Sequence, residues 1–448
     1  MHKSSLPHLF WLFFISFFLV SCSKDIVNSP PQTPKIEVDD IKTLGGSKNE
    51  SAQAVINTMD GGYAILGHTQ SIDGDVTNKF NESYDYWILK YDSTNQIQWQ
   101  KTYGGSADDR GTDITQTIDG GYAVIGKSKS SDGEVSENAG YDDFWMIKLD
   151  ENGSITWDYS FGYAGSDVPY SIIQTSDNGF LVSGVLDVTA SNGQGNRASS
   201  TQRRHAGGDY WVIKLNANGI KEWSNYYGGA FTDTAYDAIQ TADNSYIVVG
   251  SSDSADVDIS NNKGSYDFWA IKISETGTLI WEKSYGGDQV DEAHAISKTA
   301  DGNFIIVGDT RSNDLDISQN NGAADLWVIK INPEGELIWE KTLGGSNFDV
   351  GRAISKTQDN GFLISGSSRS TNGNLTNNKG QNDAWVVKIN NSGNLEWQKT
   401  IGGSEVDFFY DVVELNDQTM IAVGDSNSSN EDILENKGFT DLLILKLQ

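Results

Sequence analysis

The chain has 448 residues and carries 32 Lys and Arg against 62 Asp and Glu, a formal net charge of −30. Phosphate backbones need a basic footprint, so this balance argues against nucleic acid as a partner. A single cysteine excludes an intrachain disulfide. The 47 glycines beside 6 prolines are typical of many short strands joined by tight turns.

The first residues predict export. Residues 1–21 read as a signal peptide, with Lys3 ahead of an apolar stretch over residues 9–20. That stretch is too short and too early for a structural membrane span. The sequence LVSC at residues 19–22 resembles a lipobox, which implies that Cys22 is lipidated, for example with palmitate, and becomes the mature N-terminus. The alternative is an ordinary signal peptide with an unrelated cysteine.

The segment after the cysteine predicts a tether. Residues 23–25, SKD, resemble the short tag that takes some Bacteroidota lipoproteins to the outer face of the outer membrane. The polar, Pro-rich run VNSPPQTP follows. We therefore expect a signal peptide over 1–21, a lipidated cysteine and flexible tether over 22–35, and a folded body over 36–448. The expected location is the outer membrane, lipid-anchored, in either its periplasmic or its outward-facing leaflet.

The body repeats one unit seven times. The first glycine of a Gly-containing corner recurs at positions 45, 104, 162, 228, 286, 344 and 402, and only the third unit is longer than the others. Each unit holds four alternating, strand-like segments with Asp-Gly or Asn-Gly turns, and no helical period competes. A four-stranded sheet cannot bury both faces alone. The repeats therefore predict an all-β, seven-bladed β-propeller of four-stranded antiparallel blades.

Twelve tryptophans recur at two fixed places in this unit, which predicts packing between blades rather than a cofactor site. One set lies in Asp-x-Trp: Trp87, Trp145, Trp211, Trp269, Trp327 and Trp385. The other set precedes the glycine corner: Trp99, Trp157, Trp223, Trp281, Trp339 and Trp397.

The two chain ends predict how the ring closes. The body starts with the first strand type, over residues 36–44, and ends with the fourth type, over residues 442–447. We expect the N-terminal strand to complete the last blade, because this protects both sheet edges. The alternative makes each unit one blade, with closure resting on packing only.

The combination W-x-K-T-x-G-G-S, D-G-G-Y and D-x-W-x-I-K-L-D resembles the repeat of a group of bacterial secreted seven-bladed β-propellers, often called SBBP repeats. The resemblance covers about residues 40–448. It implies the fold and brings no assigned activity with it.

Acidic residues recur beside each glycine corner. A short acid after a glycine turn accepts backbone N–H groups and fixes the corner, which we favour over a ring of cation sites. Asx-rich loops such as residues 73–75 and 314–316 vaguely suggest calcium, but turn formation explains them better, because the EF-hand spacing is absent. The corner acids are Glu50, Asp109, Asp167, Asp233, Asp291, Asp349 and Asp407.

One position of the repeat varies, and variation within a repeated scaffold is where specificity can reside. We expect these side chains to rim one mouth of the central channel, where tyrosine, histidine and arginine can stack on and hydrogen-bond a sugar or another polar ligand. The alternative is local contacts at strand ends. The position reads Gln53, Thr112, Tyr170, Tyr236, His294, Arg352 and Tyr410.

The long loop of the third unit carries a basic cluster. Arg203, Arg204 and His205 follow Arg197 within residues 187–208, on an otherwise acidic body. We consider two interpretations, a docking site for an anionic ligand or partner and a disordered insertion.

These features favour a non-catalytic binding or scaffold lipoprotein of the cell envelope, with a glycan or an envelope protein as its partner. The alternative is a lyase-like, polysaccharide-degrading enzyme at the channel mouth, in which His, Tyr and Arg act on a uronate. No metal or cofactor is expected, because no Cys/His cluster exists and the body has only His68, His205 and His294.

Overall fold

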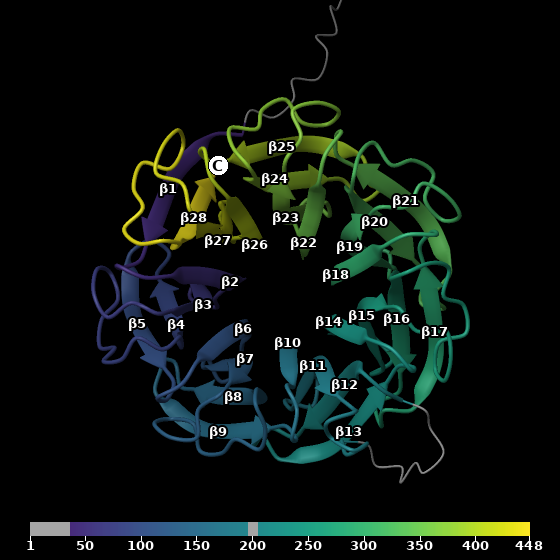
Figure 1. The fold of residues 1–448 in the computed structure, drawn as a ribbon. Helices are drawn as coiled ribbons and strands as arrows, with labels where there is room; N and C mark the ends of the chain where they lie inside the picture. The colour runs from purple at the N-terminus through teal and green to yellow at the C-terminus, as the bar shows by residue number, and fades with distance from the viewer. Residues whose placement is uncertain (1–35, 196–204) are drawn as a thin grey trace, which may run out of the picture. The chain divides into compact units, whose positions relative to one another are not determined.

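The computed structural model describes residues 36–195 and 205–448. Within these ranges the chain forms 28 strands in seven four-stranded antiparallel sheets. No helix in the described part of the chain is long and apolar enough to span a membrane. The sheets are arranged around a common centre (Figure 1). The predicted all-β, seven-bladed propeller is therefore confirmed.

Each blade runs from an innermost strand at the centre to an outermost strand at the rim (Figure 1), and we number the blades 1 to 7 by their innermost strands. The innermost strands are β2 (Glu50–Asn57), β6 (Asp109–Gln116), β10 (Val168–Gln174), β14 (Asp233–Gln240), β18 (Asp291–Lys298), β22 (Asp349–Lys356) and β26 (Asp407–Glu414). The second strands are β3 (Tyr63–Thr69), β7 (Tyr122–Ser128), β11 (Phe180–Asp187), β15 (Tyr246–Ser252), β19 (Phe304–Thr310), β23 (Phe362–Ser368) and β27 (Met420–Ser426).

The third and fourth strands complete each sheet. The third strands are β4 (Asp85–Tyr91), β8 (Asp143–Leu149), β12 (Gly208–Leu215), β16 (Asp267–Ile273), β20 (Asp325–Ile331), β24 (Asp383–Ile389) and β28 (Asp441–Leu447). The outermost strands are β5 (Ile97–Tyr103), β9 (Ile155–Phe161), β13 (Lys221–Tyr227), β17 (Leu279–Tyr285), β21 (Leu337–Leu343), β25 (Leu395–Ile401) and, in blade 7, β1 (Val38–Leu44).

Blade 7 is built from both ends of the body. Its strand order is β1-β28-β27-β26, and β1 pairs antiparallel with β28 from Val38 opposite Leu447 to Leu44 opposite Leu442. The predicted closing strand is confirmed, and the alternative of one unit per blade is wrong. The pairing covers the edge of β28, which would otherwise present unpaired backbone groups to solvent.

The Asp-x-Trp tryptophans lie between blades, as their spacing predicts. Trp145 of blade 2 is fully buried and packs on Tyr86 of blade 1, with ring centroids 4.7 Å apart. In five blades the indole N–H donates to a residue of the outermost strand, as from Trp87 to Gln100 at 2.9 Å. The second set is mostly half-buried and contacts the next blade from its rim; Trp99, for example, meets Tyr122 edge-on.

The corner acids hold the turns that join blades. Asp109 accepts the backbone N–H of Gly105 and the hydroxyl of Ser130, both at 2.7 Å. The corresponding acid accepts a corner N–H at 2.7 or 2.8 Å in every blade. The Asx loops serve the same corners, since Asp73 accepts the N–H of Ser47 at 2.8 Å. Backbone hydrogen bonding therefore explains both repeated sets of polar residues.

Candidate functional site

A β-bulge occurs at the same place in all seven innermost strands. In each strand the pairing register skips one residue, and the skipped residue is the variable one of the repeat. A bulge leaves its extra residue unpaired and re-aims its side chain. The variable side chains are therefore displayed from within the strands, as the fourth strand residue in six blades and the third in β10, rather than from the loops that join the units.

The seven variable side chains line a single cavity at the centre of the ring. Its volume is about 190 Å³, and Gln53, Thr112, Tyr170, Tyr236, His294, Arg352 and Tyr410 all contribute to its wall. The structure thus brings together the whole set that the repeat comparison selects. Small residues at the following position, such as Ala54 and Ser171, leave room for them.

Aromatic and basic side chains form a continuous arc along blades 3 to 6. Tyr170 lies 4.8 Å from Tyr236, and Tyr236 meets His294 edge-on at 5.0 Å, both between ring centroids. Arg352 continues the arc, with its Nη1 atom 2.8 Å from His294 Nε2. Gln53 and Thr112 occupy the opposite side of the cavity wall, in blades 1 and 2. The aromatic and basic side chains of blades 3 to 6 therefore face an amide and a hydroxyl group.

The surroundings of His294 favour its neutral form. Burial lowers its pKa, the charge of Arg352 acts in the same direction, and Asp309 opposes them. A guanidinium can only donate hydrogen bonds, so the imidazole nitrogen that faces Arg352 accepts. His294 Nε2 also lies 3.4 Å from Asp309 Oδ1, and the side chain is only 7% exposed. The imidazole therefore orients Arg352 more than it faces the cavity.

Three carboxylates that the sequence analysis did not select also line this cavity. Asp113, Asp237 and Asp411 directly follow a bulge residue. Burial raises the pKa of all three, to about 6 for Asp237 and about 7 for Asp411, and neighbouring carboxylates add to the rise for Asp113 and Asp411. Each accepts a backbone N–H from the next blade: Asp113 from Ile172 at 2.8 Å, Asp237 from Ile296 at 2.9 Å and Asp411 from Val55 at 2.8 Å. They connect blades 2 to 3, 4 to 5 and 7 to 1.

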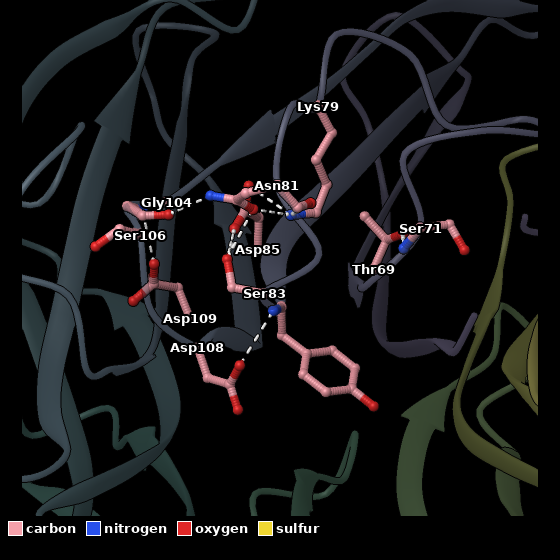
Figure 2. Close-up of polar contacts among 12 residues, drawn as sticks. Thr69, Ser71, Lys79, Asn81, Ser83, Asp85, Gly104, Ser106, Asp108 and Asp109 are labelled. Carbon is pink, nitrogen blue, oxygen red and sulfur yellow. Dashed lines mark hydrogen bonds and ion pairs between the residues drawn. The ribbon is translucent and has the colours of Figure 1, made fainter. Parts of the chain in front are cut away.

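A second polar site lies at the corner between blades 1 and 2 (Figure 2). The Lys79 side chain is fully buried there, with its ammonium 3.1 Å from Asp85 Oδ2. It also donates to the carbonyl and the side-chain oxygen of Asn81, at 2.9 and 2.7 Å. At the corresponding aspartates Asp143, Asp325 and Asp383, the Oδ1 atom is buried and has no hydrogen-bond partner among the described residues. Lys79 thus places an ammonium beside Asp85, whereas the other three aspartates have one carboxylate oxygen without a partner and bind through the other.

The basic loop of the third unit is only partly described. Arg197, Arg203 and Arg204 lie outside the described residues, as does Cys22. The His205 side chain is 2% exposed and contacts Asp209 through Nδ1, while Nε2 lies 3.9 Å from Asp258. His205 is therefore buried in a blade corner and does not line the central cavity.

No family model and no curated protein matches the chain. Solved structures with similar folds include a protein of unknown function from Bacteroides caccae (10% identity, TM-score 0.40, covering 75% of this chain and 93% of that one). Another is Sqt1 from Chaetomium thermophilum, with 11% identity and a TM-score of 0.46, covering 91% of this chain and 99% of that one. A gluconolactonase from Xanthomonas campestris has 9% identity and a TM-score of 0.34, covering 77% of this chain and 97% of that one. Likenesses this distant carry no argument about function, and the resemblance to SBBP repeats stays a prediction.

Proposed function

We propose that this protein is a non-catalytic binding lipoprotein of the bacterial cell envelope, which holds part of a glycan at the mouth of its central channel. The observation that carries this proposal is the convergence of all seven variable bulge side chains on one cavity. The strands and corners repeat from blade to blade and supply the shape, while these positions, with Asp113, Asp237 and Asp411 beside them, supply the chemistry.

The lining suits a hydroxylated ring. Tyr170 and Tyr236 offer aromatic faces and phenolic hydroxyls, and Arg352 offers several N–H donors in a fixed plane. A volume of about 190 Å³ lies below the roughly 300 Å³ at which pockets for whole drug-sized ligands begin. The cavity therefore accommodates one sugar residue or one chain end, with the rest of the glycan outside.

A glycan array with purified, delipidated protein tests the proposal. We expect a restricted set of glycans to be retained, and both Tyr170→Ala and Tyr236→Ala to lose at least tenfold in apparent affinity. Tyr141→Ala is the matched control, because Tyr141 is 65% exposed and does not line the cavity. Retention that both channel variants leave unchanged would refute the channel as the site. Absence of any retained glycan would refute the glycan function and favour a protein partner.

A lyase-like activity is the second candidate function, because tyrosine, histidine and arginine side chains line one cavity. Proton abstraction beside a uronate needs an accessible base within hydrogen-bond reach. The lone pair of His294 Nε2 accepts from Arg352, and burial raises the pKa of both Tyr170 and Tyr236, which disfavours the phenolate. These contacts favour binding over catalysis. Release of an unsaturated sugar end from polysaccharide, lost in Tyr236→Phe, would reverse that ranking.

A further inference from the structure

A second cavity, of about 300 Å³, lies where blades 5, 6 and 7 meet, and we call it the arginine pocket. Arg311 follows β19, Arg352 lies in β22 and Arg369 follows β23, and all three line it. Phe348, which precedes β22, and Phe408 of β26 supply apolar surface. Arg352 also lines the central cavity, so the two cavities share one wall.

The charge of this pocket is unusual for the chain. Four arginines lie in the described residues, and Arg110 has a carboxylate partner, Asp108, at 3.6 Å. None of the three pocket arginines has a carboxylate oxygen within 4.0 Å among the described residues, although the chain holds 62 acids against 32 bases. Guanidinium groups gathered without a close counter-ion favour an anion from outside.

The two outer arginines are placed by Phe348. Their guanidinium carbons lie 5.8 Å (Arg311) and 5.6 Å (Arg369) from the centroid of the Phe348 ring, which is 40% exposed. Cation–π contact of this kind holds a guanidinium while leaving N–H donors for other partners. Arg369 Nε donates to Asn382 Oδ1 at 3.1 Å, which fixes that side chain further.

Two acids also line the pocket, and they do not neutralise it. Asp309 is 4% exposed and lies against His294. Burial raises the pKa of Glu292, and the charge of Asp309 adds to the rise, while Arg352 and Arg311 lower it. Three permanent positive charges therefore face two carboxylates, and Glu292 takes up a proton more readily than an ordinary glutamate.

The repeat shows that these residues are not part of the scaffold. The position of Arg311 and Arg369 is held in the other five blades by Gln70, Lys129, Asp187, Asp253 and Asn427. The position of Phe348 is held by Asn49, Asp108, Ser166, Thr232, Val290 and Val406. Blades 5 and 6 therefore depart together from the repeat, and the departures meet in one cavity.

We propose that the arginine pocket binds the anionic group of an acidic sugar, whose ring lies against Phe348 and whose chain continues to the central cavity past Arg352. This inference rests on the proposed glycan function and names its ligand class. A carboxylate suits the pocket because a planar guanidinium binds it in a bidentate manner. A sulfate ester offers the same charge, and the experiment separates the two.

Isothermal titration of the folded propeller with three trisaccharides tests the inference: trigalacturonate, neutral galactotriose and a sulfated galactotriose. We expect trigalacturonate to bind at least tenfold more tightly than galactotriose, with an advantage that shrinks in higher salt. Arg311→Ala and Arg369→Ala should each remove most of that advantage and leave galactotriose unaffected. Tighter binding of the sulfated sugar would assign the site to sulfate esters.

Arg110→Ala is the matched control, because it removes the same charge from an arginine outside the pocket. Arg311 and Arg369 are exposed, so their variants should melt like the wild type, and Arg311→Lys separates bidentate contact from charge. Equal affinity for acidic and neutral sugars, or no effect of either arginine variant, overturns the anionic site and leaves the proposed function standing. Binding of trigalacturonate that needs both arginines but neither Tyr170 nor Tyr236 refutes the channel instead.

Discussion

Replacing Lys79 with methionine tests whether the corner of blades 1 and 2 depends on its built-in cation. The ammonium makes three close polar contacts, to Asp85 Oδ2 at 3.1 Å and to two oxygens of Asn81 at 2.9 and 2.7 Å. Methionine fills a similar volume and removes the charge. Breaking a buried ion pair by removing one partner costs about 3–5 kcal/mol of unfolding free energy, and we expect a loss in this range at pH 8.

The loss should depend on pH, because Asp85 can take up a proton. Burial raises the pKa of Asp85 to about 6 even with Lys79 beside it, and losing the ammonium raises it further. At pH 5 the carboxyl is then mostly neutral in both proteins, so only the hydrogen bonds of Lys79 are lost. We expect the destabilisation to be about 1–2 kcal/mol smaller at pH 5 than at pH 8, measured by urea unfolding with tryptophan fluorescence.

Asp325→Asn, at the matching corner of blade 5, is the control, because it should change the unfolding free energy in the opposite direction. Asp325 is fully buried, its Oδ1 has no partner among the described residues, and burial with the charge of Asp349 raises its pKa from 3.8 to about 6. One pKa unit corresponds to about 1.4 kcal/mol, so the charged form is disfavoured by about 3 kcal/mol at pH 8. Asparagine should therefore stabilise the protein at pH 8 and have little effect at pH 4. Equal destabilisation by both variants at both pH values would refute the reasoning.

Further predictions concern ring closure, packing, titration and the predicted lipidation. Deleting residues 36–44 exposes the edge of β28, so the melting temperature should fall and light scattering should show association; an unchanged monomer contradicts the closing role. Trp385→Ala should lower the unfolding free energy by about 3–5 kcal/mol, because the side chain is 1% exposed; a loss below 1 kcal/mol in urea titration argues against tight packing there. Burial raises the pKa of Asp237 and Asp411 to about 6 and 7, so the folded state binds more protons than the unfolded one. Stability should accordingly fall as pH rises from about 4 to 7, and Asp411→Asn should flatten that slope. Cys22→Ala should abolish labelling with radioactive palmitate and release the protein from the membrane fraction; persistent labelling would exclude Cys22 as the lipidated residue.

The fold was accessible from the sequence because the blade is a repeated unit. Seven copies reveal which positions every blade needs, such as the buried Trp385 and the corner acid Asp349. The strand types at the two ends also predict the pairing of β1 with β28, since that arrangement joins both ends of the body in one four-stranded blade and covers the edge of β28.

The site was accessible only in part. The position of Arg352 varies among the seven repeats, and this variation predicts the residues that line the central cavity. The bulge was not predictable, because the two-residue alternation expected for a strand does not reveal one extra residue. The sequence does not single out Asp113, Asp237 and Asp411, because only three of the seven blades carry an acid at the position after the bulge. That position is neither the same in every blade nor different in each of them. The arginine pocket joins Arg311 to Phe408, almost a hundred residues later, and the packing of three successive blades brings them together.

The shared seventh blade has a consequence for the order of folding during synthesis. The strand β1 is made first, yet its partner β28 is the last strand of the chain to appear. A chain is made from its N-terminus, and domains generally fold as units. Here the first strand must wait unpaired while six blades form. A chain cut short anywhere before its final residues therefore keeps an open ring with two exposed edges, which distinguishes unfinished molecules from complete ones.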